Sequence, residues 1–591
     1  MKKIIEETAK FYSKFLERFL YYQEQNLKSA TLKSVYESLA QSQKKILKKF
    51  LDHPHLWDDV QKKYLEELEK LLNKSLDQLT NGTEEEIECI PHTDRRFRHR
   101  DWYQHPFFNY LRESYLLQSS YLEKLFDVEE LDEETRRKVQ FYLRAYIDAL
   151  SPSNFPFTNP EVIRETIEQK GENLFKGYKN FLADQSKGKG FNLPALTNLK
   201  AFKVGENLAC TPGTVVFENE IFQLLQFLPT KEPYYQKPLL IIPPWINKYY
   251  IFDLQKENSF IRWNTDAGRV VYTISWVNPD ASYANTTFKD YVLRGIDKAV
   301  EEIKKIASCS DLHALGFCVG GVALNVLMAY YQRRNLKKLN SATLLASPTD
   351  FQEMGDLSLF VGEEQIALLE KILKKQGAVA GEAMMKIFSS LRANELIWPN
   401  YINSYLLGKE PPAMDFLFWN SDTTNLPAKM HLEYLKEFFL KNALVHHNQY
   451  RLGRIGIDIA EVTTPCFIVA TQKDHIVPWK AAYAGFQRLK NSVFVLGGSG
   501  HIAGIINPPQ RQKYGYWTNE TTSHAAAAEE WLKTATQHAG SWWTHWGKWV
   551  TPFLGEKNLT KAALKSPFIE NAPGRYAAQT APYIKDNIFE V

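Results

Sequence analysis

The feature that most constrains the fold is a series of short apolar runs, separated by helical stretches, that begins near residue 200. A strand made almost wholly of apolar residues is typical of a parallel sheet covered on both faces. The first two runs lie close together and predict a β-hairpin. The runs are residues 213–217, 221–227, 239–242, 270–274, 312–317, 343–346, 467–470 and 493–496. This alternation predicts a doubly wound α/β domain.

Two further regions differ from that pattern. Residues 1–200 show the 3.6-residue periodicity of amphipathic helices and predict a mostly helical N-terminal domain, so that the α/β domain covers residues 201–591. Residues 350–464 contain no comparable apolar strand and are rich in aromatic residues and proline. Insertions at the carboxyl edge of a sheet often act as lids, so this interval predicts a cap.

Composition excludes several classes of protein. The chain has 591 residues, of which 44% are apolar and 24% charged, which is globular composition. Its net charge of +4 gives no case for nucleic-acid binding. The five cysteines are widely spaced, which predicts a reduced cytoplasmic protein without a bound metal. No apolar run is long enough to span a membrane, and early acidic residues argue against a signal peptide.

The strongest motif is the run LGFCVGG at residues 315–321, where a predicted strand passes into a predicted helix. It has the pattern of a nucleophile elbow with Cys318 in the place of serine. Side chains at Gly316 and Gly320 would clash with the neighbouring helix and strand. The helix N-terminus beside Cys318 favours its thiolate form, which is the reactive nucleophile. The alternative is an inert buried cysteine in a glycine-rich turn.

A nucleophile of this kind needs an acid and then a histidine, each at the end of a later strand. Asp474 follows the run 467–470, and His501 follows the run 493–496 after a glycine-rich turn. The order nucleophile, acid, base is diagnostic, so the sequence predicts a catalytic triad of Cys318, Asp474 and His501. His475 lies beside the acid and is a candidate for substrate access or binding.

Two backbone amides are expected to stabilise a developing oxyanion. The amide of Val319 directly follows the nucleophile. The second donor should come from the loop after the run 239–242, which reads PPWIN at residues 243–247. Proline has no amide hydrogen, so the donor is Trp245 or Ile246; Ile246 is taken as the working choice.

The chain resembles the class I polyhydroxyalkanoate (poly-3-hydroxybutyrate) synthases of the α/β-hydrolase superfamily, from about residue 100 to the C-terminus. A box with Phe-Cys-Val and a long helical N-terminal region on the same chain are similar to class I. The matching motifs are GFCVGG at 316–321, PPWINK at 243–248, SWVNPD at 275–280, WNSD at 419–422, DHIVPW at 474–479, GSGH at 498–501, GSWW at 540–543 and APGRY at 572–576.

The resemblance implies an acyltransferase that polymerises (R)-3-hydroxyacyl-CoA into polyester with release of CoA, short-chain 3-hydroxybutyryl-CoA being favoured. Cys318 would carry the acyl chain, His501 would be the base, and Asp474 would complete the triad, with a second role in activating the 3-hydroxyl. The resemblance further implies a homodimer on the surface of cytoplasmic polyester granules. CoA is part of the substrate, so no cofactor is expected.

Other substrate contacts and other functions stay open. Arg392 of the insertion is a candidate for the CoA phosphates, a solvated helix arginine being the alternative, and Trp419 is a candidate for substrate contact. The first rival function is a thioesterase or thiol hydrolase of the same fold, which would pass the acyl group to water. The second is a non-catalytic granule-associated protein, which would have no need of an intact triad.

Overall fold

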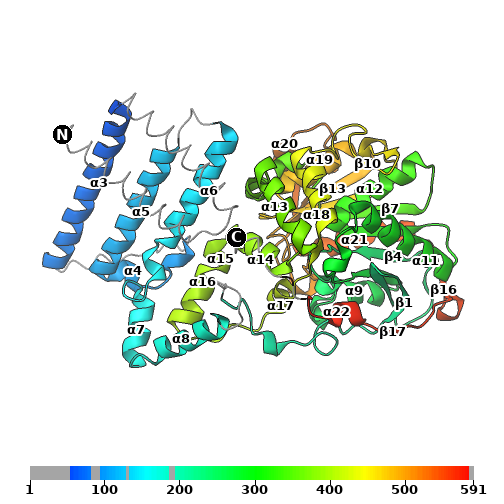
Figure 1. Ribbon diagram of the computed structural model, residues 1–591, viewed down its shortest axis with the longest axis horizontal. Helices are drawn as coiled ribbons and strands as arrows, with labels where there is room; N and C mark the ends of the chain where they lie inside the picture. Colours follow the sequence, from blue (N-terminus) through cyan, green and yellow to red (C-terminus); the bar gives the residue numbers. More distant parts are fainter. Residues whose placement is uncertain (1–53, 82–93, 128–131, 186–193, 583, 585–591) are drawn as a thin grey trace. The chain divides into compact units, whose positions relative to one another are not determined.

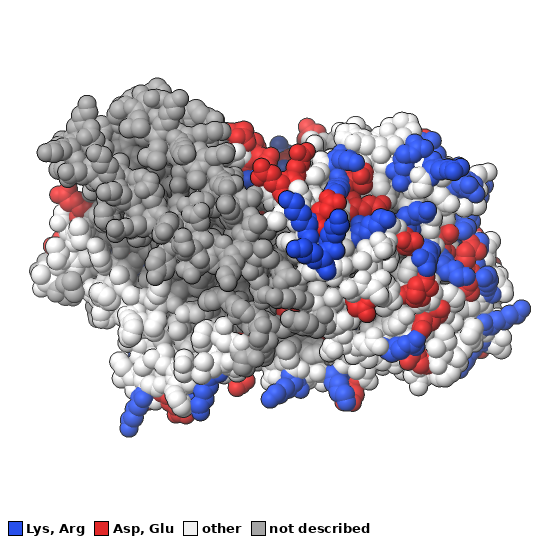
Figure 2. All heavy atoms as spheres, in the orientation of Figure 1, with Lys and Arg blue, Asp and Glu red and all other residues white. Residues whose placement is uncertain are grey.

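The structure is a computed structural model that describes residues 54–81, 94–127, 132–185, 194–582 and 584 (Figure 1). Part of the predicted helical N-terminal domain therefore lies outside the described residues. Within them, no helix is both long and apolar enough to cross a membrane. On the face seen in Figure 2, Lys and Arg lie interspersed with Asp and Glu.

The chain forms two compact units. Among the described residues, one takes in those before Thr197 together with Lys386–Pro412, and the other takes in Thr197–Met385 and those from Ala413 onward. The middle of the predicted cap thus belongs to the same unit as the N-terminal helices. The domain boundaries given above stay predictions.

The second unit is built on an eleven-stranded sheet in the order β15-β14-β13-β12-β7-β6-β4-β5-β2-β1-β17. All eight predicted runs form strands of this sheet, which confirms the prediction. They are β1 (Thr214–Glu218), β2 (Phe222–Phe227), β4 (Leu239–Ile242), β5 (Val271–Trp276), β6 (Leu312–Phe317), β7 (Leu339–Leu345), β12 (Cys466–Thr471) and β13 (Ser492–Gly497).

The centre of the sheet, from β13 through β12, β7, β6 and β4 to β5, is parallel. Between successive strands run α9 (Phe260–Asp266), α11 (Lys298–Ala307), α12 (Val319–Arg333) and α19 (Trp479–Arg488). Because these helices cover the sheet, β4, β5, β6 and β12 are buried along their whole length. This is the predicted doubly wound arrangement.

The edges of the sheet are antiparallel, and of these only the β1–β2 hairpin was predicted. Strands β1 and β2 form the expected hairpin, and β2 joins the parallel block by pairing antiparallel with β5. The other additions are short: β14 (Tyr516–Thr518), β15 (Thr536–His538) and β17 (Glu570–Asn571). Segments of two or three residues carry too little periodicity to be recognised in a sequence.

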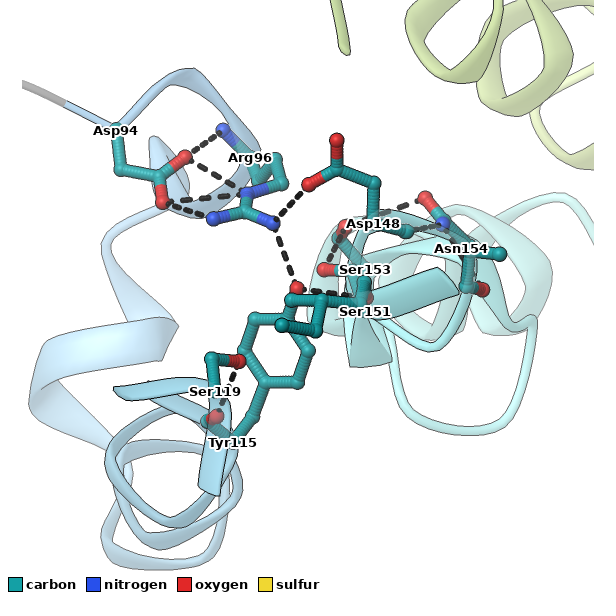
Figure 3. Close-up of polar contacts among 10 residues, drawn as sticks. Asp94, Arg96, Tyr115, Ser119, Asp148, Ser151, Ser153 and Asn154 are labelled. Atoms are coloured by element: carbon teal, nitrogen blue, oxygen red, sulfur yellow. Dashed lines mark hydrogen bonds and ion pairs between the residues drawn. The ribbon is translucent and has the colours of Figure 1, made fainter. Parts of the chain in front are cut away.

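The first unit is helical, as predicted for the described part of the N-terminal region. Helix α5 (Pro106–Phe126) packs against α3 (Pro54–Asn81) and α6 (Glu133–Ala149) (Figure 1). Arg96, in the segment before α5, makes hydrogen bonds to residues of both α5 and α6. Its guanidinium donates to Asp94, to the Tyr115 hydroxyl at 2.6 Å and to Asp148 Oδ1 at 3.1 Å (Figure 3).

The inserted segment Lys386–Pro412 belongs to this unit through helix α8 (Glu172–Gln185). Asn173 Nδ2 donates to the Leu406 carbonyl at 2.9 Å, and the Tyr405 hydroxyl donates to Asp184 Oδ2 at 3.0 Å. Helix and segment touch at Gly177, where an added Cβ atom would lie 1.9 Å from the Tyr405 carbonyl oxygen.

The close approach at Gly177 gives the first prediction. Gly→Ala at an open position inside a helix usually stabilises a protein by about 0.5–1 kcal/mol. Here we expect Gly177→Ala to lower the free energy of unfolding by about 1–3 kcal/mol, because the methyl group must push α8 away from Tyr405. Thermal or urea unfolding of the full chain measures this change. A variant as stable as the wild type, or more stable, would contradict the described packing.

Candidate active site

Cys318 occupies the turn between strand β6 and helix α12. Its backbone angles are φ 52° and ψ −123°, and its side chain is buried, at 7% exposed. Residues other than glycine rarely adopt a positive φ of this kind, which costs of order 1–3 kcal/mol and is typical of functional sites. The turn is therefore a strained strand-to-helix turn, as a nucleophile elbow requires.

The glycines around Cys318 make this turn possible. A Cβ atom at Gly316 would lie 2.6 Å from Gly321 Cα, which is in the first turn of α12. A Cβ atom at Gly320 would lie 2.4 Å from the carbonyl oxygen of Ile242, at the end of the adjacent strand β4. Both distances are impossible for real side chains, so the predicted close approaches to helix and strand are confirmed.

Asp474 and His501 are brought together at the ends of β12 and β13. His501 Nδ1 lies 2.7 Å from Asp474 Oδ2, and both residues are buried. A carboxylate can only accept, so Nδ1 carries the proton and Nε2 is left for the nucleophile. The second oxygen of Asp474 accepts from the amides of Ile476 and Val477, each at 2.9 Å. These bonds fix the carboxylate in its orientation toward His501.

The charges at the site change the protonation of His501. Burial by itself lowers the pKa of its imidazole, but the negative charges of Asp474 and Cys318, together with hydrogen bonds to both side chains, outweigh burial and raise the pKa to about 10. The ring of Phe317, next to the nucleophile, stacks on the imidazole at 5.1 Å between centroids. The imidazole is therefore held in place between the carboxylate and the thiol, ready to exchange a proton with the sulfur.

The predicted oxyanion donors lie at the same edge of the sheet. Strand β4 is the neighbour of β6, with Ile242 opposite Gly316, so the loop after β4 lies beside the elbow. Among the described residues, the amides of Val319, Trp245 and Ile246 donate no hydrogen bond. Amides without a partner at a helix start and in an adjacent loop are what an oxyanion site requires.

The other predicted residues have different surroundings. His475 is half-buried on the loop of Asp474. Trp419 is buried, and its indole nitrogen donates to the Lys248 carbonyl at 2.7 Å. Arg392 lies in the unit of the N-terminal helices, where it pairs with Glu395 at 3.4 Å. A role in substrate binding stays a prediction for all three.

Two features of the site were given no role by the sequence analysis. Tyr434, at the end of α18 (Ala428–Tyr434), is buried; burial and the charge of Cys318 raise its pKa well above the ordinary value. Asp422 pairs with the buried ammonium of Lys248 at 2.7 Å. The two residues end the motifs PPWINK and WNSD, but neither motif shows that the lysine is buried or that it pairs with the carboxylate of the other motif.

One group of potential metal ligands occurs among the described residues. His447, Asp458 and Glu461 place one ligand atom each within 4.8 Å of one another. The imidazole of His447 is mostly exposed, and Glu461 also pairs with Arg333. None of the three belongs to the triad, and exposed acidic groups of this kind are common without a metal.

Comparison with known families agrees with this geometry. The family described as "Poly-beta-hydroxybutyrate polymerase (PhaC) N-terminus" matches residues 93–264. The family described as "alpha/beta hydrolase fold" matches residues 237–508, which confirms the predicted fold class. A monoacylglycerol lipase structure from Paleococcus ferrophilus is 13% identical with a TM-score of 0.30, over 47% of this chain and 90% of that one; we draw nothing from a likeness at this level.

Curated relatives match over most of the chain. The poly(3-hydroxyalkanoate) polymerase subunit PhaC of Rhizobium etli is 42% identical, over 82% of this chain and 77% of that protein. The poly(3-hydroxyalkanoate) polymerase of Methylorubrum extorquens is 38% identical, over 93% and 91%. The subunit PhaC of Cupriavidus necator is 38% identical, over 88% of each.

The raised pKa of His501 predicts a pH dependence of stability. Below the ordinary value of 6.5 the imidazole is protonated in both folded and unfolded chains, so its pairing stabilises the fold fully. As pH rises toward about 10 the folded state loses that proton and the stabilisation with it. We expect the free energy of unfolding to fall by about 1–4 kcal/mol between pH 7 and 10.

Urea unfolding at a series of pH values measures this effect, and Asp474→Asn is the matched variant. Because this variant lacks the carboxylate charge, its free energy of unfolding should fall less than half as much between pH 7 and 10 as that of the wild type. Identical pH profiles for the wild type and Asp474→Asn would contradict the pairing.

Proposed function

Because the chain belongs to the poly(3-hydroxyalkanoate) polymerases, a family of acyltransferases, we propose that it polymerises (R)-3-hydroxyacyl-CoA into polyester with release of CoA. The observation that carries the proposal is the strained, buried Cys318 within reach of an imidazole that Asp474 holds by a 2.7 Å hydrogen bond.

In the first step Cys318 takes the acyl group from CoA. The raised pKa of His501 keeps a proton on its Nε2, so the sulfur attacks the thioester carbonyl as the thiolate paired with the imidazolium. The amides of Val319 and Ile246 stabilise the charge that develops on the carbonyl oxygen. The bond to the CoA sulfur then breaks, and that sulfur leaves with the proton from His501. One thioester has replaced another, so the acyl group stays activated.

In the second step the 3-hydroxyl of another hydroxyacyl unit attacks the Cys318 thioester. His501, left neutral by the first step, accepts the hydroxyl proton, an ester bond forms, and the sulfur of Cys318 departs as the thiolate beside the protonated imidazole. Formation of an oxygen ester from a thioester is downhill and drives elongation. Asp474 orients His501 in both steps, and its two oxygens also accept bonds from Thr471 and the amides of Ile476 and Val477. Its second role, direct activation of the 3-hydroxyl, stays a prediction.

Exclusion of water favours the synthase over the thioesterase. Cys318 and His501 are 7% and 6% exposed, and a hydrolase reaction needs water at the acyl-cysteine. Aromatic rings pack next to the loop after β4: Trp245 contacts Tyr434 and Phe288 at centroid distances of 6.2 and 5.8 Å. An apolar enclosure of this kind suits a hydroxyacyl chain better than it suits a water nucleophile.

Further parts of the proposal concern substrate length and assembly. We propose that the substrate is a short-chain hydroxyacyl-CoA such as 3-hydroxybutyryl-CoA. We also propose that the protein works as a homodimer at the surface of cytoplasmic polyester granules. Fluorescence localisation in granule-forming cells and light scattering of the purified protein test the last two points.

Product analysis tests the activity itself. The purified protein is given (R)-3-hydroxybutyryl-CoA, and free thiol and acyl product are followed together. CoA release with insoluble polyester is the expected result. CoA release with only free 3-hydroxybutyrate would establish the thioesterase instead. No CoA release would contradict a short-chain synthase and favour a longer substrate or a binding role.

Substitution of the nucleophile gives a sharper prediction. We expect Cys318→Ala to lose CoA release by at least about 10⁴-fold, because the covalent intermediate cannot form. Cys210→Ala is the matched control and should keep the wild-type rate. Cys210 is exposed, and partial loss of solvent around its sulfur, together with the nearby charges of Asp253 and Glu206, raises the pKa of its thiol, so it is not an activated nucleophile. Substantial CoA release by Cys318→Ala would remove the nucleophile assignment.

A further inference from the structure

The loop after β4, residues 243–248, is held by hydrogen bonds to its carbonyl groups. Trp276 Nε1 donates to the Pro243 carbonyl at 2.9 Å. Trp419 Nε1 donates to the Lys248 carbonyl at 2.7 Å, from helix α17 (Asp415–Ser421) of the insertion. The two ends of the loop are thereby fixed by buried indole groups.

The middle of the loop is bound by one residue of the insertion, Thr424. Its hydroxyl donates to the Trp245 carbonyl at 2.8 Å, and its amide donates to the Ile246 carbonyl at 3.3 Å. Thr424 is 2% exposed, so water does not compete for these bonds. The insertion therefore sets the orientation of two successive peptide groups in the loop.

The first of these bonds acts on the proposed oxyanion donor. The Trp245 carbonyl and the Ile246 amide belong to one planar trans peptide group, so they point in opposite directions. When Thr424 fixes the carbonyl on one side, the amide hydrogen is fixed on the other. The Ile246 amide donates to nothing else among the described residues. Without the Thr424 hydroxyl, the Trp245 carbonyl would lose the hydrogen bond that fixes this peptide group directly.

A buried ion pair anchors the segment that carries Thr424. Asp422 Oδ1 lies 2.7 Å from Lys248 Nζ, and the Tyr250 hydroxyl donates to Asp422 Oδ2 at 2.7 Å. Lys248 Nζ also donates to the carbonyls of Ala577 and Gln579 in the C-terminal segment, at 2.9 and 2.7 Å. Asp422 and Lys248 thus hold together the end of α17, the loop after β4 and the C-terminal segment.

We propose that Thr424 is a positioning residue for the acyl-transfer reaction: its hydroxyl orients the Trp245–Ile246 peptide group so that the Ile246 amide faces the oxyanion. The inference rests on the proposed function. The insertion between β7 and β12 then does more than cover the site. Its Thr424 side chain also aligns the Ile246 amide, which stabilises the transition state. A donor of this kind is worth about 10²–10³-fold in rate, and misplacement loses much of that.

The test compares Thr424→Val, which removes the hydroxyl but keeps the branched shape, with Thr424→Ser, which keeps the hydroxyl. The rate of CoA release is measured as a function of (R)-3-hydroxybutyryl-CoA concentration, with thermal unfolding of each variant. We expect kcat of Thr424→Val to fall about 10- to 100-fold with KM within about threefold, and Thr424→Ser to recover most of the loss.

A second readout separates alignment of the donor from damage to the site. Alkylation of Cys318 by iodoacetamide does not need the oxyanion donor, so its rate should be the same in Thr424→Val and the wild type. Thr349→Val is the matched control, because the Thr349 hydroxyl is also buried but has no hydrogen-bond partner in the part of the chain that the structure describes. Its kcat should equal that of the wild type.

Three results would overturn the proposal: wild-type kcat in Thr424→Val, an equal loss in Thr424→Ser, or a parallel loss of Cys318 alkylation. Failure of the proposed function has a different signature, because the wild type itself would then release free 3-hydroxybutyrate in place of polyester, or would release no CoA.

Discussion

The site depends on the contact between the first turn of α12 and the strands on either side of it. Gly316 and Gly320 let helix and sheet approach to distances that no side chain would allow, and this approach forces Cys318 into its positive φ. The same turn leaves the Val319 amide, at the helix start, without a hydrogen-bond partner among the residues that the structure describes. Strain, exposure of the sulfur to the imidazole and an available amide are thus consequences of one packing constraint.

The remainder of the site is assembled from distant segments by buried polar contacts. Asp474 and His501 meet because β12 and β13 are adjacent parallel strands whose carboxyl ends lie at one edge. The insertion contributes through Asp422 and Thr424, which bind the loop after β4. Burial makes these bonds effective, since an unpaired carbonyl or charge inside the protein would be costly. The insertion therefore both covers the site and aligns the loop after β4.

The sequence predicted the eight main strands, the elbow and the order of the triad, because each is a local pattern of side chains. It did not predict the short antiparallel strands β14, β15 and β17, whose two or three residues show no periodicity. Nor did it separate Lys386–Pro412 from the rest of the insertion, since the contacts of that segment with α8 join residues more than two hundred positions apart.

The sequence by itself determined the strand-turn-helix of the nucleophile and the fold class, since the spacing of glycines and apolar residues leaves few alternatives. Only the tertiary structure decided which groups surround that nucleophile. The 2.7 Å bond from His501 to Asp474 and the bond from Thr424 to the Trp245 carbonyl join residues far apart in the chain. Such contacts depend on the register of strands and on burial, and neither is written in any one stretch of sequence.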